Sequence, residues 1–143
     1  MPMEDLERIR TNFETFSADH LDELLKAYDP HFIYHPRSDE PDASLKANRD
    51  EFERLIRGWL ETFPQITFDV HEMDQVGDCL IAVTTLHGRA SSSGLEVDDD
   101  YVFVYRMRGG LAIGGWEYRT KDEALAAVAA NRAGLDSPPQ TAA

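Results

Sequence analysis

The main change in the hydrophobic pattern of the chain comes at Pro64, and this change restricts the fold more than any other feature. Before Pro64, apolar side chains recur every three or four residues, which is the spacing of amphipathic helices. After it, apolar and polar residues alternate through successive segments, which is the period of half-buried β-strands. Early helices followed by a run of strands predict an α+β fold, because the helices must bury their apolar stripes on one face of the sheet.

Three helices are predicted in the first half of the chain and one near its end. The first covers residues 4–16, and a short second helix follows Ser17, which can cap its N-terminus. The third begins at Asn48, where the string N-R-D-E is typical of a capping box. The last, at 121–131, follows Thr120 in the similar string T-K-D-E.

The strands are separated by turn-forming segments that are rich in glycine, serine or proline. They are expected at 31–35, 65–74, 78–90, 95–107 and 111–119. Residues 36–47 contain two prolines and many turn formers, so they predict a loop. The last four strands form a meander in this interpretation. One domain is therefore expected over 1–131, followed by a disordered tail at 132–143.

Charge and composition exclude several classes of function. The 143 residues carry a formal net charge of −13, without a basic stripe that could bind nucleic acid or an anionic membrane surface. Cys79 is the only cysteine, so an intrachain disulfide cannot form and a reducing compartment is favoured. The N-terminus lacks a signal-peptide pattern, and no apolar run approaches the length of a membrane span. We therefore expect a cytoplasmic protein.

Several strings resemble the SnoaL-like branch of the nuclear transport factor 2-like superfamily. They are YDPHFIYHP at 28–36, NRDEF at 48–52, FPQITFDV at 63–70 and RMRGGLAIGGWEYRTKDEALAAV at 106–128. The superfamily includes ketosteroid isomerases, limonene-epoxide hydrolases, scytalone dehydratases, polyketide cyclases and binding modules, so the resemblance does not imply one reaction. It implies a cone-shaped half-barrel of the cystatin-like α+β type, in which a curved, mainly antiparallel sheet and the N-terminal helices enclose a pocket. It also implies a homodimer built on the sheet.

Asp99 is the first candidate catalytic residue. Alternate positions of the 95–107 strand are apolar or aromatic except for Asp99, so this carboxylate is expected to face inward beside Tyr101 and Phe103. Burial among rings raises the pKa of a carboxyl group and can make it a proton carrier near neutral pH. A bulge in the acidic run would instead turn Asp99 outward, and a position at the sheet edge would leave it in water.

His35, at the end of the first expected strand, is the second candidate catalytic residue. The resemblance places it where ketosteroid isomerases carry their catalytic aspartate, and an imidazole there could act as a general base because its pKa is close to neutrality. Its role could also be a hydrogen bond to the following loop. Phe103 weakens the case for an enzyme, because many cyclase-like relatives carry an aspartate or histidine at that strand position.

A set of aromatic residues is expected around the pocket, in contact with its ligand: Tyr34, Trp59, Tyr101, Phe103, Tyr105, Trp116 and Tyr118. Packing in the core is the alternative for each ring. Together the rings favour a flat or cyclic apolar ligand. The five histidines lack metal-binding spacing and the glycines form no phosphate loop, so neither a metal nor another cofactor is expected.

Three functions remain open from the sequence. A cofactor-independent isomerase, cyclase, dehydratase or hydrolase would move a proton with Asp99 or His35 while a tyrosine stabilised an oxyanion. A non-catalytic protein would bind a small molecule in the same pocket. A dimerisation module would use the outer face of the sheet. The first two are distinguished by whether Asp99 and His35 share one closed cavity.

Overall fold

The computed structural model describes residues 3–37, 46–90 and 92–130. The helices in these ranges are α1 (Met3–Glu14), α2 (Leu21–Leu25), α3 (Arg49–Thr62) and α4 (Lys121–Ala130). The strands are β1 (Tyr28–His35), β2 (Ala47–Asn48), β3 (Thr67–Val76), β4 (Cys79–Arg89), β5 (Glu96–Arg108) and β6 (Leu111–Tyr118). The tail predicted at 132–143 and most of the loop predicted at 36–47 lie outside the described residues. None of the helices in the described ranges is long and apolar enough to cross a membrane.

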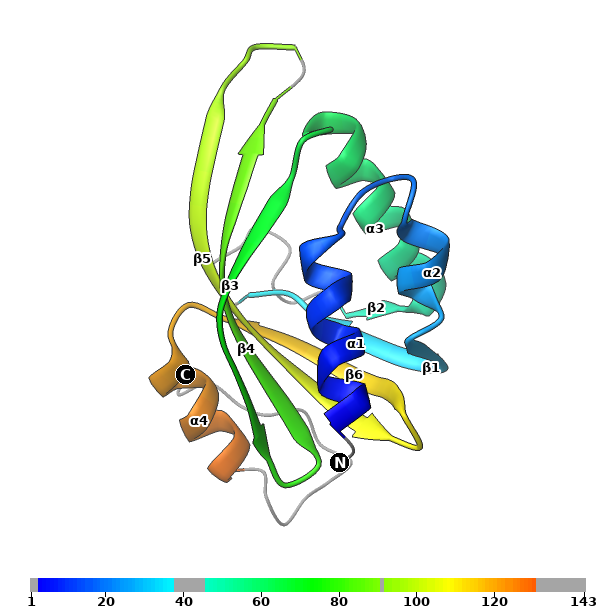
Figure 1. Cartoon of the computed structure of the whole chain (residues 1–143), viewed down its shortest axis with the longest axis vertical. Coiled ribbons are helices and arrows are strands. Elements are labelled where there is room, and N and C mark those ends of the chain that lie inside the picture. Colours follow the sequence, from blue (N-terminus) through cyan, green and yellow to red (C-terminus); the bar gives the residue numbers. More distant parts are fainter. Residues whose placement is uncertain (1–2, 38–45, 91, 131–143) are drawn as a thin grey trace.

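All six strands belong to one sheet, in the order β2-β1-β6-β5-β4-β3. From β3 to β6 the strands form the predicted antiparallel meander, while β1 pairs in parallel with β6 and β2 is antiparallel to β1. Helices α1, α2 and α3 lie on one side of the sheet and α4 on the other (Figure 1). The predicted α+β architecture is confirmed.

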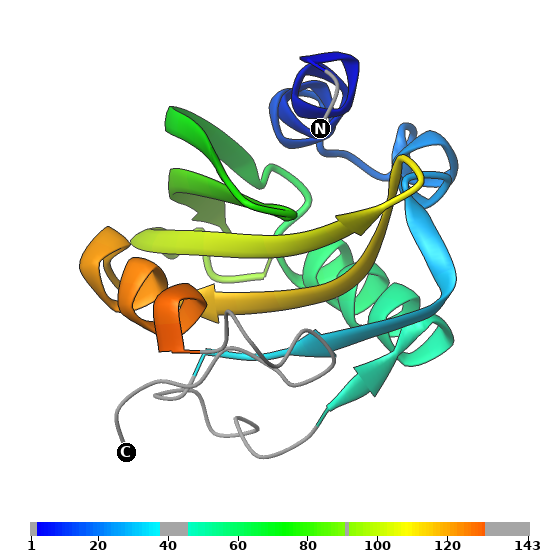
Figure 2. The ribbon, with the colours of Figure 1, turned by 90° about the horizontal axis from the view of Figure 1, so that it is seen from below.

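Bulges bend the sheet around the helices, and Figure 2 shows the curvature from below. The β3–β4 register shifts between Val70 and Glu72, and the β5–β6 register shifts between Arg106 and Met107. An extra residue in one strand bends it and increases its twist. The first bulge also changes which side chains face the helices. Met73 packs against the same core as Phe68, whereas strict alternation would turn it outward.

The sheet is buried on both faces over much of its area. The larger core lies between the concave face and helices α1–α3. A smaller core lies on the convex face under α4, and its buried members are Cys79, Ile81, Val102, Val104, Trp116, Tyr118, Ala124, Ala127 and Val128. Successive residues of β5 alternate between the two, since Phe103 and Tyr105 belong to the larger core and Val104 to the smaller.

The second helix differs from its prediction. It begins at Leu21, and the residue at its N-cap, His20, makes no capping side-chain bond. The Ser17 hydroxyl accepts a bond from the His20 backbone N–H at 3.3 Å, so Ser17 closes the turn before the helix instead of capping it. The expected strand at 31–35 begins earlier, at Tyr28.

The capping box at the start of α3 is confirmed and gives a testable prediction. Asn48 Oδ1 accepts from the Glu51 backbone N–H at 2.9 Å, and Glu51 Oε1 accepts from the Asn48 N–H at 3.0 Å. Asn48→Ala is expected to lower the free energy of unfolding by about 1 kcal/mol, because a helix N–H loses its partner. Urea unfolding measures this. Asn48→Asp keeps an acceptor oxygen and should lose much less, and an equal loss in both variants would contradict the capping explanation.

Candidate ligand-binding site

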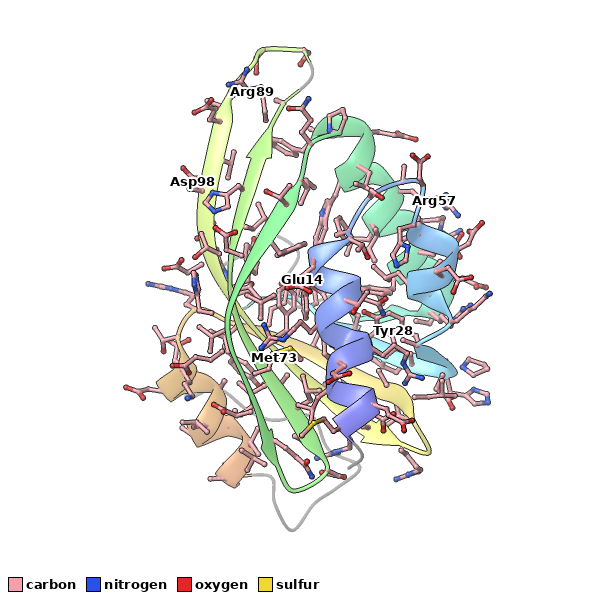
Figure 3. The ribbon with its side chains drawn as sticks, viewed as in Figure 1. Glu14, Tyr28, Arg57, Met73, Arg89 and Asp98 are labelled. Carbon is pink, nitrogen blue, oxygen red and sulfur yellow. The ribbon has the colours of Figure 1, made fainter. Side chains whose placement is uncertain are left out.

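A cavity lies between the concave face of the sheet and helices α1–α3. From the helices and the segment after α1, its wall contains Ile9, Asn12, Phe13, Phe16, Leu24, Phe52, Ile56 and Trp59. From the sheet, it contains Tyr28, Tyr34, Phe68, Phe103 and Tyr105. Tyr28 is labelled in Figure 3. Nine of these thirteen residues are aromatic, so the wall is apolar and made of flat surfaces.

The wall itself fills most of the hollow. The Phe13 ring centroid lies 5.1 Å from that of Phe103, and the Tyr34 centroid lies 4.7 Å from that of Phe52. The remaining cavity volume is about 30 Å³, which is room for about two water molecules. A ring-sized ligand therefore needs side chains to move. Phe16 and Trp59 are the wall residues best able to do so, because both are only partly buried.

Two polar atoms in the wall have no hydrogen-bond partner among the described residues. They are the Asn12 amide nitrogen and the Tyr34 hydroxyl oxygen, and both are buried. A buried polar group without a partner costs about 1–3 kcal/mol, so such groups are usually satisfied by water or by a ligand. A cavity with one free amide donor and one free hydroxyl can orient a molecule that carries a few polar atoms.

Two further hydroxyls in the wall bond to each other. The oxygens of Tyr28 and Tyr105 lie 3.4 Å apart. Burial raises the pKa of Tyr28 to about 12, and burial likewise raises the pKa of Tyr105 well above its ordinary value. Both phenols therefore stay neutral near pH 7 and neither is a ready proton acceptor.

A buried carboxyl group, Glu117, lies on the same face of the sheet. Glu117 is the direct partner of Phe103 in the β5–β6 pair, and such partners share a face. Its side chain is buried, and its Oε1 accepts a hydrogen bond from the Arg37 backbone N–H at 2.9 Å. Its Oε2 has no partner in the described part of the chain. Burial raises the pKa of Glu117 to about 8, so the group is mostly protonated at neutral pH.

Sequence reasoning overlooked both Glu117 and Arg37. The available signal for Glu117 was that it is the only charged residue of β6, where all the others are apolar, aromatic or glycine. Arg37 gave no such signal, because it stands in a segment rich in turn formers.

Asp99 lies on the concave face but outside the cavity wall. Its Oδ2 accepts from Arg37 Nη2 at 2.9 Å, and 42% of its side chain is exposed. The Arg37 guanidinium also donates to the Asp100 backbone oxygen at 2.9 Å and lies 4.3 Å from the Tyr101 ring centroid. The expected environment, an isolated carboxyl group among rings, is therefore not the one that the structure shows. Asp99 is the ion-pair partner of a nearly buried arginine.

Three other expected site residues lie on the opposite face of the sheet. His35 stacks on Trp116 with the ring centroids 5.0 Å apart, and Trp116 and Tyr118 belong to the smaller core. The prediction that Trp116 and Tyr118 line the pocket is therefore wrong. Glu117 takes the concave position, so its strand neighbours must face the convex side. Burial, with a smaller effect of Lys46, lowers the pKa of His35 to about 4.

The remaining expected contacts are placed as follows. Tyr34, Trp59, Phe103 and Tyr105 line the cavity. Tyr101 lies beside it, with its ring centroid 5.8 Å from that of Phe103. In the three described ranges, no group of three or more histidine, cysteine, aspartate or glutamate residues is placed to hold a metal ion.

Comparisons with known proteins agree with this architecture. An NTF2-like protein of unknown function from Burkholderia pseudomallei has 19% identity and a TM-score of 0.69, over 87% of this chain and 96% of that one. A proposed SnoaL-like polyketide cyclase from Jannaschia sp. has 16% identity and a TM-score of 0.66, over 96% and 94%. TerC, co-crystallised with polyporic acid, has 14% identity and a TM-score of 0.64, over 94% and 98%. Such identities show the NTF2-like fold alone.

Sequence comparison adds the family to the fold. None of the curated proteins matches the chain by sequence. The family model of the SnoaL-like domain matches residues 9–114, which is most of the 143 residues. The chain therefore belongs to the SnoaL-like domain family.

Proposed function

We propose that this protein binds a small, mainly apolar cyclic molecule in the cavity under α1–α3. The observation that carries the proposal is the composition of the wall. Nine of its residues are aromatic, and polar atoms of Asn12 and Tyr34 have no hydrogen-bond partner within the described ranges. Rings provide a large contact area for a flat ligand, and the two polar groups fix its orientation. The co-crystal of TerC with polyporic acid supports the use of this fold for binding small molecules.

Binding is favoured over catalysis by the positions of the two predicted catalytic residues. His35 lies on the convex face, and Asp99 is held by Arg37 at the exposed end of the concave face. The two therefore do not share the closed cavity that an isomerase or cyclase using both of them would need. The acid–base enzyme remains the alternative, and it would require a different proton carrier.

The proposal predicts that indane, a two-ring hydrocarbon, binds in the cavity. We expect a Kd on the order of 0.1 mM for a ligand of this size. In two-dimensional NMR spectra, amide signals of the cavity wall, such as those of Phe13 and Phe103, should shift on titration. Signals of the convex core, such as that of Val128, serve as the internal control and should stay in place. Shifts confined to the convex core, or none at all, would contradict the proposal.

The homodimer implied by the family resemblance stays a prediction. The uncovered convex face of β3–β5 carries His87 bonded to both Asp69 and Asp98, and all three side chains are exposed. A dimer through this part of the sheet would have to desolvate these acidic and basic side chains, which is costly unless each finds a partner. Light scattering at several protein concentrations tests the predicted homodimer, and a monomer at every concentration would contradict it.

A further inference from the structure

The concave face continues past the cavity to Glu117. On β6 the preceding concave position is Gly115, which has no side chain, and the rings of Phe32 and Tyr105 pack over it. Phe103, a wall residue, is the direct β5 partner of Glu117. Tyr34, another wall residue, is the β1 partner of Gly115, which precedes Glu117 by two positions and so shares its face. The Tyr34 hydroxyl and Glu117 Oε2, which have no hydrogen-bond partner among the described residues, therefore belong to adjoining positions of one surface.

We propose that Glu117 is the residue that selects the ligand, by donating a hydrogen bond from Oε2 to an uncharged oxygen acceptor on the bound ring. This inference rests on the proposed binding function. It narrows the ligand to cyclic compounds with a carbonyl, ether or hydroxyl oxygen.

The position of the acidic hydrogen follows from the bonding of the carboxyl group. Oε1 accepts the Arg37 backbone N–H, so it is the carbonyl-type oxygen, and the hydroxyl of the neutral acid is on Oε2. An O–H group that is buried without an acceptor is unfavourable. A ligand oxygen would supply that acceptor.

The groups around Glu117 are consistent with a neutral acid. On the β1 side these are Arg37 and Tyr34, and on the β5 side they are Asp99 and Tyr101. The Arg37 guanidinium donates to Asp99 and lies over the Tyr101 ring, while Glu117 accepts from the backbone N–H of the same arginine. Burial then raises the pKa of Glu117 to about 8.

The same arrangement disfavours an anionic ligand. Arg37, which contacts Glu117 through its backbone, forms an ion pair with Asp99 at 2.9 Å. A carboxylate in the cavity would lose its hydration, and the described wall contains no lysine or arginine to pair with it. Such burial of a charge is costly in an apolar site. An uncharged oxygen needs only the donors that Glu117 and Asn12 offer.

The test compares 1-indanone with indane, which share a ring system and differ in the carbonyl group. At pH 6.5 the native protein is expected to bind 1-indanone about tenfold more tightly than indane. Glu117→Gln should keep this preference, because its amide can still accept from Arg37 and donate to the ligand. Glu117→Leu should lose it. Glu61→Gln, at an exposed position of α3, is the matched control and should behave like the native protein.

The pH dependence gives a second readout, which a purely structural role would not produce. For the native protein, the affinity for 1-indanone should fall about tenfold between pH 7 and pH 9, because only the protonated acid donates. The affinity of Glu117→Gln for 1-indanone should stay constant, as should the affinity of the native protein for indane.

The outcomes separate this inference from the proposed function. Equal affinity for the two probes, or a preference that survives in Glu117→Leu, overturns the role of Glu117 and leaves the cavity as the binding site. Failure of both probes to bind overturns both proposals. If Glu117→Leu does not fold, the pH profile of Glu117→Gln decides, because a tenfold fall in that variant would place the titrating group elsewhere.

Discussion

At pH 8, the free energy of unfolding of Glu117→Gln is expected to be about 4 kcal/mol higher than that of the native protein. At pH 4.5 the two proteins should be nearly equally stable. The folded carboxyl group has a pKa of about 8, against an ordinary value of 4.5. Between these pH values the unfolded chain has released a proton that the folded chain keeps. The unfolded state therefore binds fewer protons, and the stability of the native protein falls as the pH rises. A glutamine has no proton to lose.

Urea unfolding of both proteins from pH 4.5 to pH 9 measures this difference. It should grow by about 1.4 kcal/mol per pH unit and level off above pH 8. Glu61→Gln, which removes one carboxyl group from an exposed position, should show no such difference and serves as the control. If Glu117→Gln were the less stable protein at pH 8, the carboxyl group would have to be ionised and paired in the folded state.

The parts of the fold that the sequence predicted have local signals. The capping box at Asn48 is contained in four consecutive residues, and the alternation of β5 placed its bounds one residue from those observed, at Glu96–Arg108. The parallel pairing of β1 with β6 has no local signal, because it joins segments about eighty residues apart. The bulge after Val70 also has no sequence signal. One extra residue changes which face of the sheet the following side chains point to, without changing the composition of the strand.

The site was harder to predict than the fold, for two physical reasons. The phase of β5 placed Asp99 on the concave face, but the ion pair that changes its environment comes from Arg37, which is distant in sequence. On β6, alternation puts Trp116 and Tyr118 on one face and Glu117 on the other, but it does not say which of these faces is concave. The sequence prediction took the wrong one. The volume of the cavity depends on how the rings pack, and a hydrophobic pattern does not contain that information.

Phe103→Ala is expected to lower the free energy of unfolding by about 3–5 kcal/mol and to strengthen the binding of indane about tenfold. The ring is buried in the middle of the larger core, with its centroid 5.1 Å from that of Phe13 and 6.2 Å from that of Tyr105. Removing it leaves a void next to the existing cavity of about 30 Å³. A two-ring ligand could then enter with less displacement of Phe16 and Trp59.

Val104→Ala is the matched control, because Val104 is the next residue of the same strand and is fully buried in the smaller core. It should also lose stability, by roughly 1–3 kcal/mol, without any gain in affinity for indane. Thermal unfolding with and without indane measures both effects, since a ligand raises Tm according to its affinity for the folded state. A larger rise for Phe103→Ala places the ligand on the concave face. Equal rises in Tm for the two variants would mean that indane binds in any void in the protein. That result would contradict the aromatic cavity as the specific binding site.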